Sequence, residues 1–341
     1  MSSIVSDVVV DVQYGDCGKG KVTHHLARTG NYTHVVRYNG GHNAGHTIYH
    51  EGEKFVTHAI PCGVFFGIKS IIGPGCVINP DRLLEEMNEL RSAGVDVDNL
   101  LMIASNAHVI TDWHLIEDGK DSKIGTTKRG NGPAYRDKYG RKGVRASESH
   151  LLKDYIVDIY EEFHNNQKHS QVNILFEGAQ GFGLDIDWGD YPYVTSSHCT
   201  SASAFLNGVP PSSIRNVYGV GKIYETYVGA KQFEMEEASL AERIRSVGQE
   251  FGATTGRPRQ VNWFDIDSIS RAIDINGVTK LVINKVDVLE DLAGEEGDYL
   301  RVYHGDDMFS FESVEDMKYY IREHVSRDNM DIYFSGNKDR I

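Results

Sequence analysis

Cysteine is scarce in this chain of 341 residues, and its four copies form no pattern. They are scattered at Cys17, Cys62, Cys76 and Cys199, with no CxxC pair among them. This spacing argues against a disulfide framework and against a structural zinc site. Reduced thiols are typical of a cytoplasmic protein, and we expect the chain to act in the cytoplasm.

Long hydrophobic runs are also missing. No apolar segment approaches the roughly 20 residues that a membrane-spanning helix needs. Met1-Ser2-Ser3 is not followed by the charged and apolar regions of a signal peptide. We therefore expect no membrane partner.

Basic residues are outnumbered by acidic ones: 35 Lys and Arg face 49 Asp and Glu, which gives a net charge of −14. This balance argues against the broad basic face of a nucleic-acid-binding protein, so we expect no nucleic-acid partner. Any phosphate binding must then be local.

The alternation of apolar runs and helix-like stretches predicts an α/β fold around a twisted, mostly parallel, doubly wound sheet. The expected strands lie at 8–12, 34–37, 71–72, 100–104, 174–176, 217–220, 281–283 and 332–334. No repeat or linker divides 1–341, so we predict a single large domain. It carries a glycine-rich, charged excursion at about 117–149.

Two helices are predicted from local signals in the sequence. Asn79-Pro80-Asp81 combines a capping residue, a proline and an acid, which predicts a helix that starts there and ends at Gly94. A further helix is predicted over 151–163.

A glycine-rich loop follows the first expected strand. Its sequence at 14–21, YGDCGKGK, nearly matches a P-loop, in which backbone N–H groups and a helix N-terminus bind phosphate. Val22 stands where such loops carry the Mg²⁺-binding Ser or Thr, so a metal must find another ligand. Asp16 is the candidate, either as metal ligand or as general base. The alternative is a turn that only joins strand to helix.

A second loop at 38–47 carries two histidines four residues apart, His42 and His46. Metalloprotease spacing needs a helix and a Glu between them, whereas this segment has Asn43 and Gly45, so we do not predict zinc here. Its glycines allow close approach to a ligand, and an imidazole titrates near neutral pH. A histidine that only bonds a buried carbonyl is the alternative.

Three further segments indicate anion or base recognition. The segment 124–145 combines hydroxyl side chains, glycines and a basic cluster that includes Arg141, a composition suited to binding an anion. The alternative is that these charges only form a solvated face. Gln180 follows an expected strand, at the sheet edge where ligands collect, and its amide is suited to reading a base. Arg257 and Arg259 suit a dicarboxylate.

The strand expected at 281–283 ends in Asn284-Lys285-Val286-Asp287, an NKxD motif. In GTP-binding proteins this Asp accepts hydrogen bonds from guanine while the Lys stem covers the ring. Together with the phosphate loop, the motif favours a guanine nucleotide. A regulatory GTPase shares both features, but it predicts a Ser or Thr after Lys21, which is absent. A catalytically idle nucleotide-binding protein is the third alternative.

Seven segments, taken in order, resemble the adenylosuccinate synthetase family. They are GDxGKGK at 15–21, GGHNAGHT at 40–47, IGTTxRGxGPAY at 124–135, EGAQG at 177–181, YPYVTSS at 191–197, FGxTTGRxR at 251–259 and KxDVL at 285–289. The resemblance implies one large α/β domain, a homodimer and Mg²⁺ as cofactor. It implies a ligase that joins L-aspartate to C6 of a 6-oxopurine nucleoside monophosphate through a 6-phosphoryl intermediate. IMP, L-aspartate and GTP then give adenylosuccinate, GDP and phosphate.

The resemblance also implies roles for single residues. Asp16 takes the purine N1 proton, Lys19 neutralises the transferring phosphoryl group, and His46 stabilises its charge or protonates an oxygen. Mg²⁺ is matched to Asp16 and the Gly45 carbonyl. The residues matched to the nucleoside monophosphate are Asn43, Thr127, Gln180, Thr195, Val228 and, from the neighbouring subunit, Arg141. Those matched to aspartate are Thr255, Arg257 and Arg259. Those matched to the nucleoside triphosphate are Gly15, Gly18, Gly20, Lys21, Thr47, Lys285, Asp287 and Gly336.

The chain departs from the family pattern at several positions. Cys17 stands where the family usually has Glu, Tyr227 where it has Arg, and Lys231-Gln232-Phe233 replaces Gly-Pro-Phe. The chain is compact, like archaeal and viral members. Viral relatives convert dGMP to 2-amino-2'-deoxyadenylosuccinate, some with ATP or dATP, and they act in the host cytoplasm. That alternative stays open, while Asp16 and the Lys285/Asp287 pair favour IMP and GTP.

Overall fold

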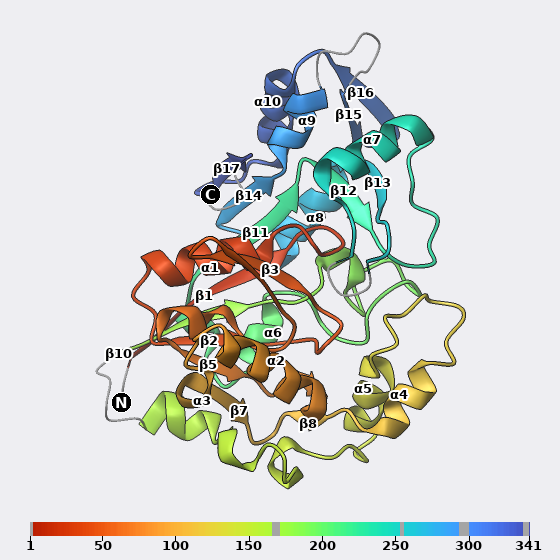
Figure 1. Ribbon diagram of the computed structural model, residues 1–341. Coiled ribbons are helices and arrows are strands. Elements are labelled where there is room, and N and C mark those ends of the chain that lie inside the picture. The colour runs from red at the N-terminus through yellow and green to blue at the C-terminus, as the bar shows by residue number, and fades with distance from the viewer. Residues whose placement is uncertain (1–2, 166–170, 253–255, 293–299, 337–340) are drawn as a thin grey trace.

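The computed structural model describes residues 3–165, 171–252, 256–292, 300–336 and 341. Its main feature is a sheet of nine parallel strands, with the first strand of the chain in the middle (Figure 1). In sheet order the strands are β17 (Asp331–Ser335), β14 (Lys280–Asn284), β11 (Ile214–Lys222), β1 (Ser3–Asp11), β10 (Gln171–Glu177), β2 (His34–Arg37), β5 (Lys69–Ile72), β7 (Leu101–Ala104) and β9 (Ile156–Val157). The prediction of an α/β fold around a mostly parallel sheet is confirmed.

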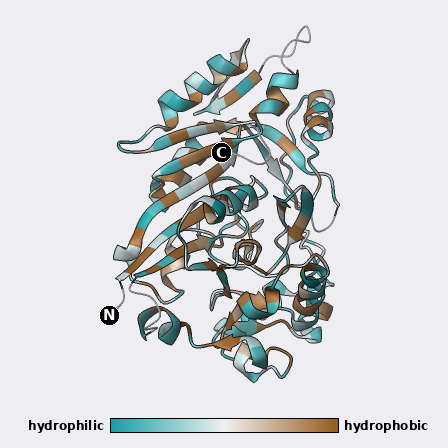
Figure 2. Cartoon of the chain, turned by 60° about the vertical axis from the view of Figure 1, so that its left-hand side comes forward, coloured by the Kyte–Doolittle hydropathy of each residue, from teal (hydrophilic) through white to brown (hydrophobic). Residues whose placement is uncertain are grey.

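The central strand β1 is apolar over most of its length because it lies in the interior. Val8, Val9 and Val10 are fully buried, and β1 pairs with β10 on one side and β11 on the other. Such two-sided burial is typical of parallel strands that read as continuous apolar runs. Figure 2 shows hydrophobic stretches in the strands and mixed hydrophobic and hydrophilic residues on the helices around them.

Smaller sheets and helices surround the large sheet. A four-stranded sheet contains β12 (Tyr224–Tyr227), β13 (Gln260–Asp265), β15 (Leu300–His304) and β16 (Asp307–Phe311). Two strand pairs are β3 (His46–His50) with β4 (Glu53–Thr57), and β6 (Val77–Ile78) with β8 (His108–Val109). The helices are α1 (Lys19–Thr29), α2 (Pro80–Ser92), α3 (Val97–Leu100), α4 (Asp112–Asp118), α5 (Asn131–Tyr139), α6 (Ala202–Phe205), α7 (Ala238–Gly248), α8 (Ile266–Asn276), α9 (Val286–Leu292) and α10 (Val314–Val325).

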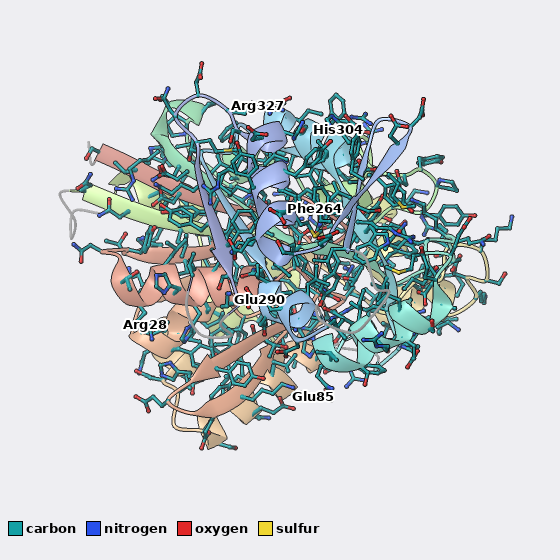
Figure 3. All side chains as sticks on the ribbon, turned by 90° about the horizontal axis from the view of Figure 1, so that it is seen from above. Arg28, Glu85, Phe264, Glu290, His304 and Arg327 are labelled. Atoms are coloured by element: carbon teal, nitrogen blue, oxygen red, sulfur yellow. The ribbon has the colours of Figure 1, made fainter. Side chains whose placement is uncertain are left out.

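Helix α1 packs on β1 and β10, and α8 contacts β11, so both help to bury the middle of the sheet. Seen from above in Figure 3, Arg28, Glu85 and Arg327 lie near the outline of the molecule, whereas the buried Phe264 of β13 lies inside it. Among the described residues, no helix combines the length and the hydrophobicity needed to cross a bilayer.

Helix α2 starts as its sequence predicts. The Asn79 side chain accepts the N–H of Arg82 at 3.1 Å, and Pro80 is the first helical residue. A capping side chain of this kind satisfies one N–H group that the first turn leaves unpaired.

The helix predicted over 151–163 is wrong. The structure has a 3₁₀ turn at Lys153–Tyr155, the strand β9, and a π-helical turn at Glu161–Asn165. Ile156 and Val157 pair with β7 and extend the edge of the large sheet. This β-branched pair prefers strand geometry, and sheet pairing overrides the local helical pattern.

Candidate active site

Charged side chains end four strands in the middle of the large sheet. β1 ends at Asp11, β2 at Arg37, β10 at Glu177 and β11 at Lys222, and all four residues are buried. Parallel strands bring their carboxyl ends to one edge of a sheet, where α/β proteins bind ligands. A buried charge is costly in free energy unless it is paired. Because four such residues gather at this edge, we take the edge as the candidate site.

A cavity of about 550 Å³ opens at this edge. Its walls come from the loops after β1, β2 and β10, the segment 117–133, and the residues between β12 and β13. The predicted site residues among its lining are Gly15, Asp16, Lys19, Asn43, Gly45, His46, Thr127, Gln180, Thr195, Val228, Arg257 and Arg259. Residues predicted for three different substrates thus face one space.

The phosphate loop is built around the buried carboxylate of Asp11. Its Oδ1 accepts the N–H groups of Gln13 and Gly15 at 3.0 and 3.1 Å, and its Oδ2 accepts that of Cys17 at 3.1 Å. The Lys19 ammonium lies 3.0 Å from Oδ2 and also lines the cavity. The N–H groups of Gly15 and Cys17 therefore bond Asp11, unlike those of a simple P-loop, which all face phosphate.

Asp16 lies in the left-handed region, with φ 57°, and its side chain is 38% exposed toward the cavity. Its Oδ2 accepts a hydrogen bond from Nε of Arg259 at 3.1 Å and forms an ion pair with Nη2 of the same guanidinium at 3.0 Å. Desolvation raises the pKa of Asp16, but the positive charges of Arg259, Lys222 and Lys19 outweigh that effect and hold the pKa below its usual value. The carboxylate is therefore ionised at neutral pH, as a base or a metal ligand must be.

His46 is held by a second buried carboxylate, that of Glu177. One Glu177 oxygen lies 2.7 Å from His46 Nδ1 and 2.6 Å from Arg37 Nη2, and the other accepts the N–H of Cys62 at 3.0 Å. A carboxylate only accepts hydrogen bonds, so we assign the imidazole proton to Nδ1.

The charges around His46 keep its ring neutral in this state. Burial and the Arg37 guanidinium lower the pKa of His46 to about 4, although Glu177 opposes them. Burial raises the pKa of Glu177, but Arg37 and His46 outweigh it and bring the pKa to about 2. The pair is thus a carboxylate and a neutral imidazole at pH 7.

The residues predicted for the nucleoside monophosphate converge on Asn43. Its side-chain oxygen accepts the amide groups of Gln180 at 2.9 Å and of Asn131, the first residue of α5, at 2.7 Å. Thr127, Thr195 and Val228 line the same cavity. Asn131 was not predicted from the sequence.

Two predicted residues stand apart from this group. Arg141 follows α5, is exposed, and is not among the described residues that line the cavity. Thr255 lies outside the described residues. Tyr227, noted as a departure from the family pattern, is buried and lines the cavity, with its ring edge-on to Tyr14.

The residues predicted for the triphosphate gather around the phosphate loop and the ends of β14 and β17. Lys21 donates to the Ser335 hydroxyl at 2.9 Å, and Asn284 donates to the Cys17 carbonyl at 2.7 Å. Gly18 has φ 96°, and a Cβ there would lie 2.8 Å from Asn284 Nδ2, so only glycine fits. These contacts connect the first loop to the last strands of the chain.

The NKxD residues lie beside this junction. A Cβ on Gly336 would lie 3.1 Å from Asp287, so these two predicted residues are neighbours. The Lys285 ammonium donates to the Gly248 carbonyl at 2.7 Å. A Cβ on Gly20 would lie 3.1 Å from the Thr47 carbonyl, which places β3 close against α1.

His42 is buried in the same loop as Asn43, and it supports a prediction about stability. Burial, followed by the positive charges of His58, Arg129 and other groups, lowers the pKa of His42 to about 3. The unfolded chain binds a proton here below about pH 6.5, whereas the folded chain does not, so acidification destabilises the fold.

We expect the His42→Asn variant to lose this pH dependence. The difference in the free energy of unfolding between the variant and the wild type should change by about 1.4 kcal/mol per pH unit between pH 6 and 4.5, because the wild type loses more stability on acidification. Urea unfolding across this range measures the gap. Parallel curves for the two proteins would show that His42 is protonated in the folded state.

Sequence reasoning missed the buried charges beneath the cavity. Asp11, Arg37, Lys222 and Glu250 were not predicted as site residues, and Glu177 was noted only as part of a motif. One signal was available: Asp11 and Arg37 directly follow runs of valine, where an ionisable residue needs a partner.

Comparison with known proteins gives a consistent result. A family model described as adenylosuccinate synthetase matches residues 8–152 and 147–295. The adenylosuccinate synthetase of Koribacter versatilis is 41% identical over 336 aligned residues, which cover 84% of this chain and 76% of the relative. That of Geobacillus kaustophilus is also 41% identical, over 340 residues, with 85% and 78% covered.

Two solved structures share the fold. The fully ligated adenylosuccinate synthetase from Plasmodium falciparum superposes with a TM-score of 0.84 at 27% identity, and the match covers 98% of this chain and 97% of that one. The cyanophage S-2L succinoaminodeoxyadenylate synthetase, bound to dGMP and dATP, has a TM-score of 0.70 at 24% identity, with 94% and 99% covered.

Proposed function

The chain belongs to the adenylosuccinate synthetase family, and from this we propose that it joins L-aspartate to C6 of IMP at the expense of GTP. The observation that carries the proposal is the shared cavity, in which Asp16, Lys19, Asn43, His46 and Arg259 face one another. The products are adenylosuccinate, GDP and phosphate.

In the first half of the reaction Asp16 accepts the N1 proton of the purine, which makes O6 nucleophilic. O6 then forms a bond to the γ-phosphorus while the bond between that phosphorus and the β,γ-bridging oxygen breaks. Lys19 lies at the cavity wall to balance the charge of the transferring group. His46 lies on the same cavity, where it stabilises the charge of the transferring group, and Glu177 holds its ring through Nδ1.

In the second half the aspartate amine attacks C6, the 6-phosphate leaves with the C–O bond electrons, and the proton that the amine loses goes to the leaving phosphate. Arg257 and Arg259 bind the carboxylates of aspartate, since guanidinium groups match carboxylate geometry. Asn43 and Gln180, which already bond each other, fix the purine nucleotide during both steps.

Mg²⁺ fits this site. Asp16 offers an ionised carboxylate and Gly45 a backbone carbonyl on the same cavity, and Mg²⁺ prefers few protein oxygens together with phosphate oxygens. Bound there, the ion would neutralise phosphate charge.

We further propose a cytoplasmic homodimer in which Arg141 reaches the nucleotide of the neighbouring subunit. Arg141 is exposed and does not line the cavity described above, which supports this role. The four free cysteines support a reducing compartment.

A substrate comparison tests the proposal. IMP and dGMP are offered separately with L-aspartate, Mg²⁺ and either GTP or ATP, and kcat/KM is measured from phosphate release. We expect IMP with GTP to be preferred, since Lys285 and Asp287 complete an NKxD motif whose first residue, Asn284, donates to the Cys17 carbonyl of the phosphate loop. A clear preference for dGMP would contradict the proposed substrate, IMP. GTP hydrolysis without aspartate would contradict the proposed ligase function.

A further inference from the structure

Glu250 is a fully buried carboxylate that has no role in the reaction described above. It follows α7 and immediately precedes the loop 251–259. Its Oε2 accepts from the Lys222 ammonium at 2.7 Å and from Nη1 of Arg259 at 2.5 Å, and its Oε1 accepts from the Tyr224 hydroxyl at 2.7 Å. Burial raises the pKa of Glu250, but Lys222 and Arg259 outweigh it and bring the pKa to about 2.

The guanidinium of Arg259 contacts Glu250 on one side and the cavity on the other. One end of its guanidinium, Nη1, donates to Glu250, while Nε donates to the Asp16 carboxylate and Nη2 lies 3.0 Å from it in an ion pair. The side chain is only 11% exposed, yet it lines the cavity. Glu250 therefore determines which edge of the guanidinium faces the ligand space.

The charges of this cluster balance in pairs. Glu250 and Asp16 carry two negative charges, and Lys222 and Arg259 carry two positive ones. Lys222 is fully buried and already bonds Glu250, so a second cation is not needed merely to pair the buried carboxylate. The contact of Glu250 with Arg259 instead fixes the Nη1 end of a guanidinium whose other edge is held by Asp16.

We propose that Glu250 is the positioning residue of the aspartate subsite. It orients Arg259 so that a substrate carboxylate bound to this guanidinium lies next to Asp16, and hence next to the N1–C6 edge of the purine. The proposal rests on the proposed function, because it takes aspartate as the ligand of Arg259. Glu250 touches no substrate and acts only through Arg259.

The test compares Glu250→Gln with Glu162→Gln. Glu162 makes a matched control because it also pairs with two basic side chains, Lys69 and His34, but does not line the cavity. We expect Glu250→Gln to raise the KM for aspartate at least about tenfold, the scale of one lost charged hydrogen bond, with the KM of both nucleotides changed less than about twofold. Glu162→Gln should leave all three KM values within about twofold.

An activity-independent measurement accompanies the kinetics. The side-chain Nε–H of Arg259 should give a sharp ¹⁵N NMR signal in the wild type, identified by its loss in Arg259→Lys, and a broadened one in Glu250→Gln. An unchanged signal, or equal rises of all three KM values, would overturn the positioning role. If the wild type does not use aspartate, the proposed function fails, and the NMR comparison still decides whether Glu250 orients Arg259.

Discussion

Replacing Asp16 with Asn is expected to lower kcat at least about 100-fold, which is the scale of a lost general base. Asn has nearly the same size but cannot take the N1 proton, so O6 stays a poor nucleophile. The substitution also removes the negative charge that Arg259 bonds from across the cavity. Steady-state phosphate release with saturating substrates measures the loss.

Two comparisons make the Asp16 result specific. Calorimetry should show the Kd of the monophosphate nucleotide within a few fold of the wild type, since the contacts proposed for Asn43 and Gln180 do not involve Asp16. Glu85→Gln, an exposed change on α2, should leave kcat unaltered. Turnover of Asp16→Asn close to that of the wild type would remove Asp16 from the role of base.

Glu177→Gln is expected to destabilise the fold by about 3 kcal/mol, the lower end for breaking a buried ion pair. One carboxylate oxygen now accepts from Arg37 and His46 and the other from the Cys62 N–H, so the amide nitrogen of Gln would face a donor at either position. Arg37 would then hold a buried charge without its partner. Urea unfolding at pH 7 measures the loss.

The same variant should also lose at least about tenfold in kcat, because the tautomer and orientation of His46 depend on Glu177. Adding Arg37→Met should recover part of the stability, since the unpaired charge is gone, but it should not recover kcat. A double variant as unstable as the sum of the two single changes would show that Arg37 and Glu177 do not act as a pair.

The sequence predicted the parts of the site that lie in glycine-rich loops. Asp16, His46, Gln180 and Arg259 stand in segments whose composition is unusual for a strand or helix, and all four face the cavity. The large parallel sheet was equally visible, because buried parallel strands are continuous apolar runs such as Val8-Val9-Val10.

The supporting charges were not predictable in the same way. Asp11 pairs with Lys19 a short distance along the chain, but Glu177 meets Arg37 because β10 and β2 are neighbours in the sheet, and Glu250 meets Lys222 because the segment after α7 packs at the end of β11. Strand order is a property of the whole fold. The failed helix at 151–163 has the same origin, since pairing with β7 decided the conformation of Ile156 and Val157.

The position of β1 in the middle of the sheet has a consequence for synthesis on the ribosome. Its neighbours β10 and β11 begin at Gln171 and Ile214, and the Lys21 ammonium donates to Ser335. The first strand and the first loop therefore contact segments that are translated much later. A nascent chain therefore completes the contacts of this loop only after the last strand has been made. Chains released before β17 is made would lack the strand that carries Ser335. Chaperones and proteases would then encounter them with an incomplete sheet.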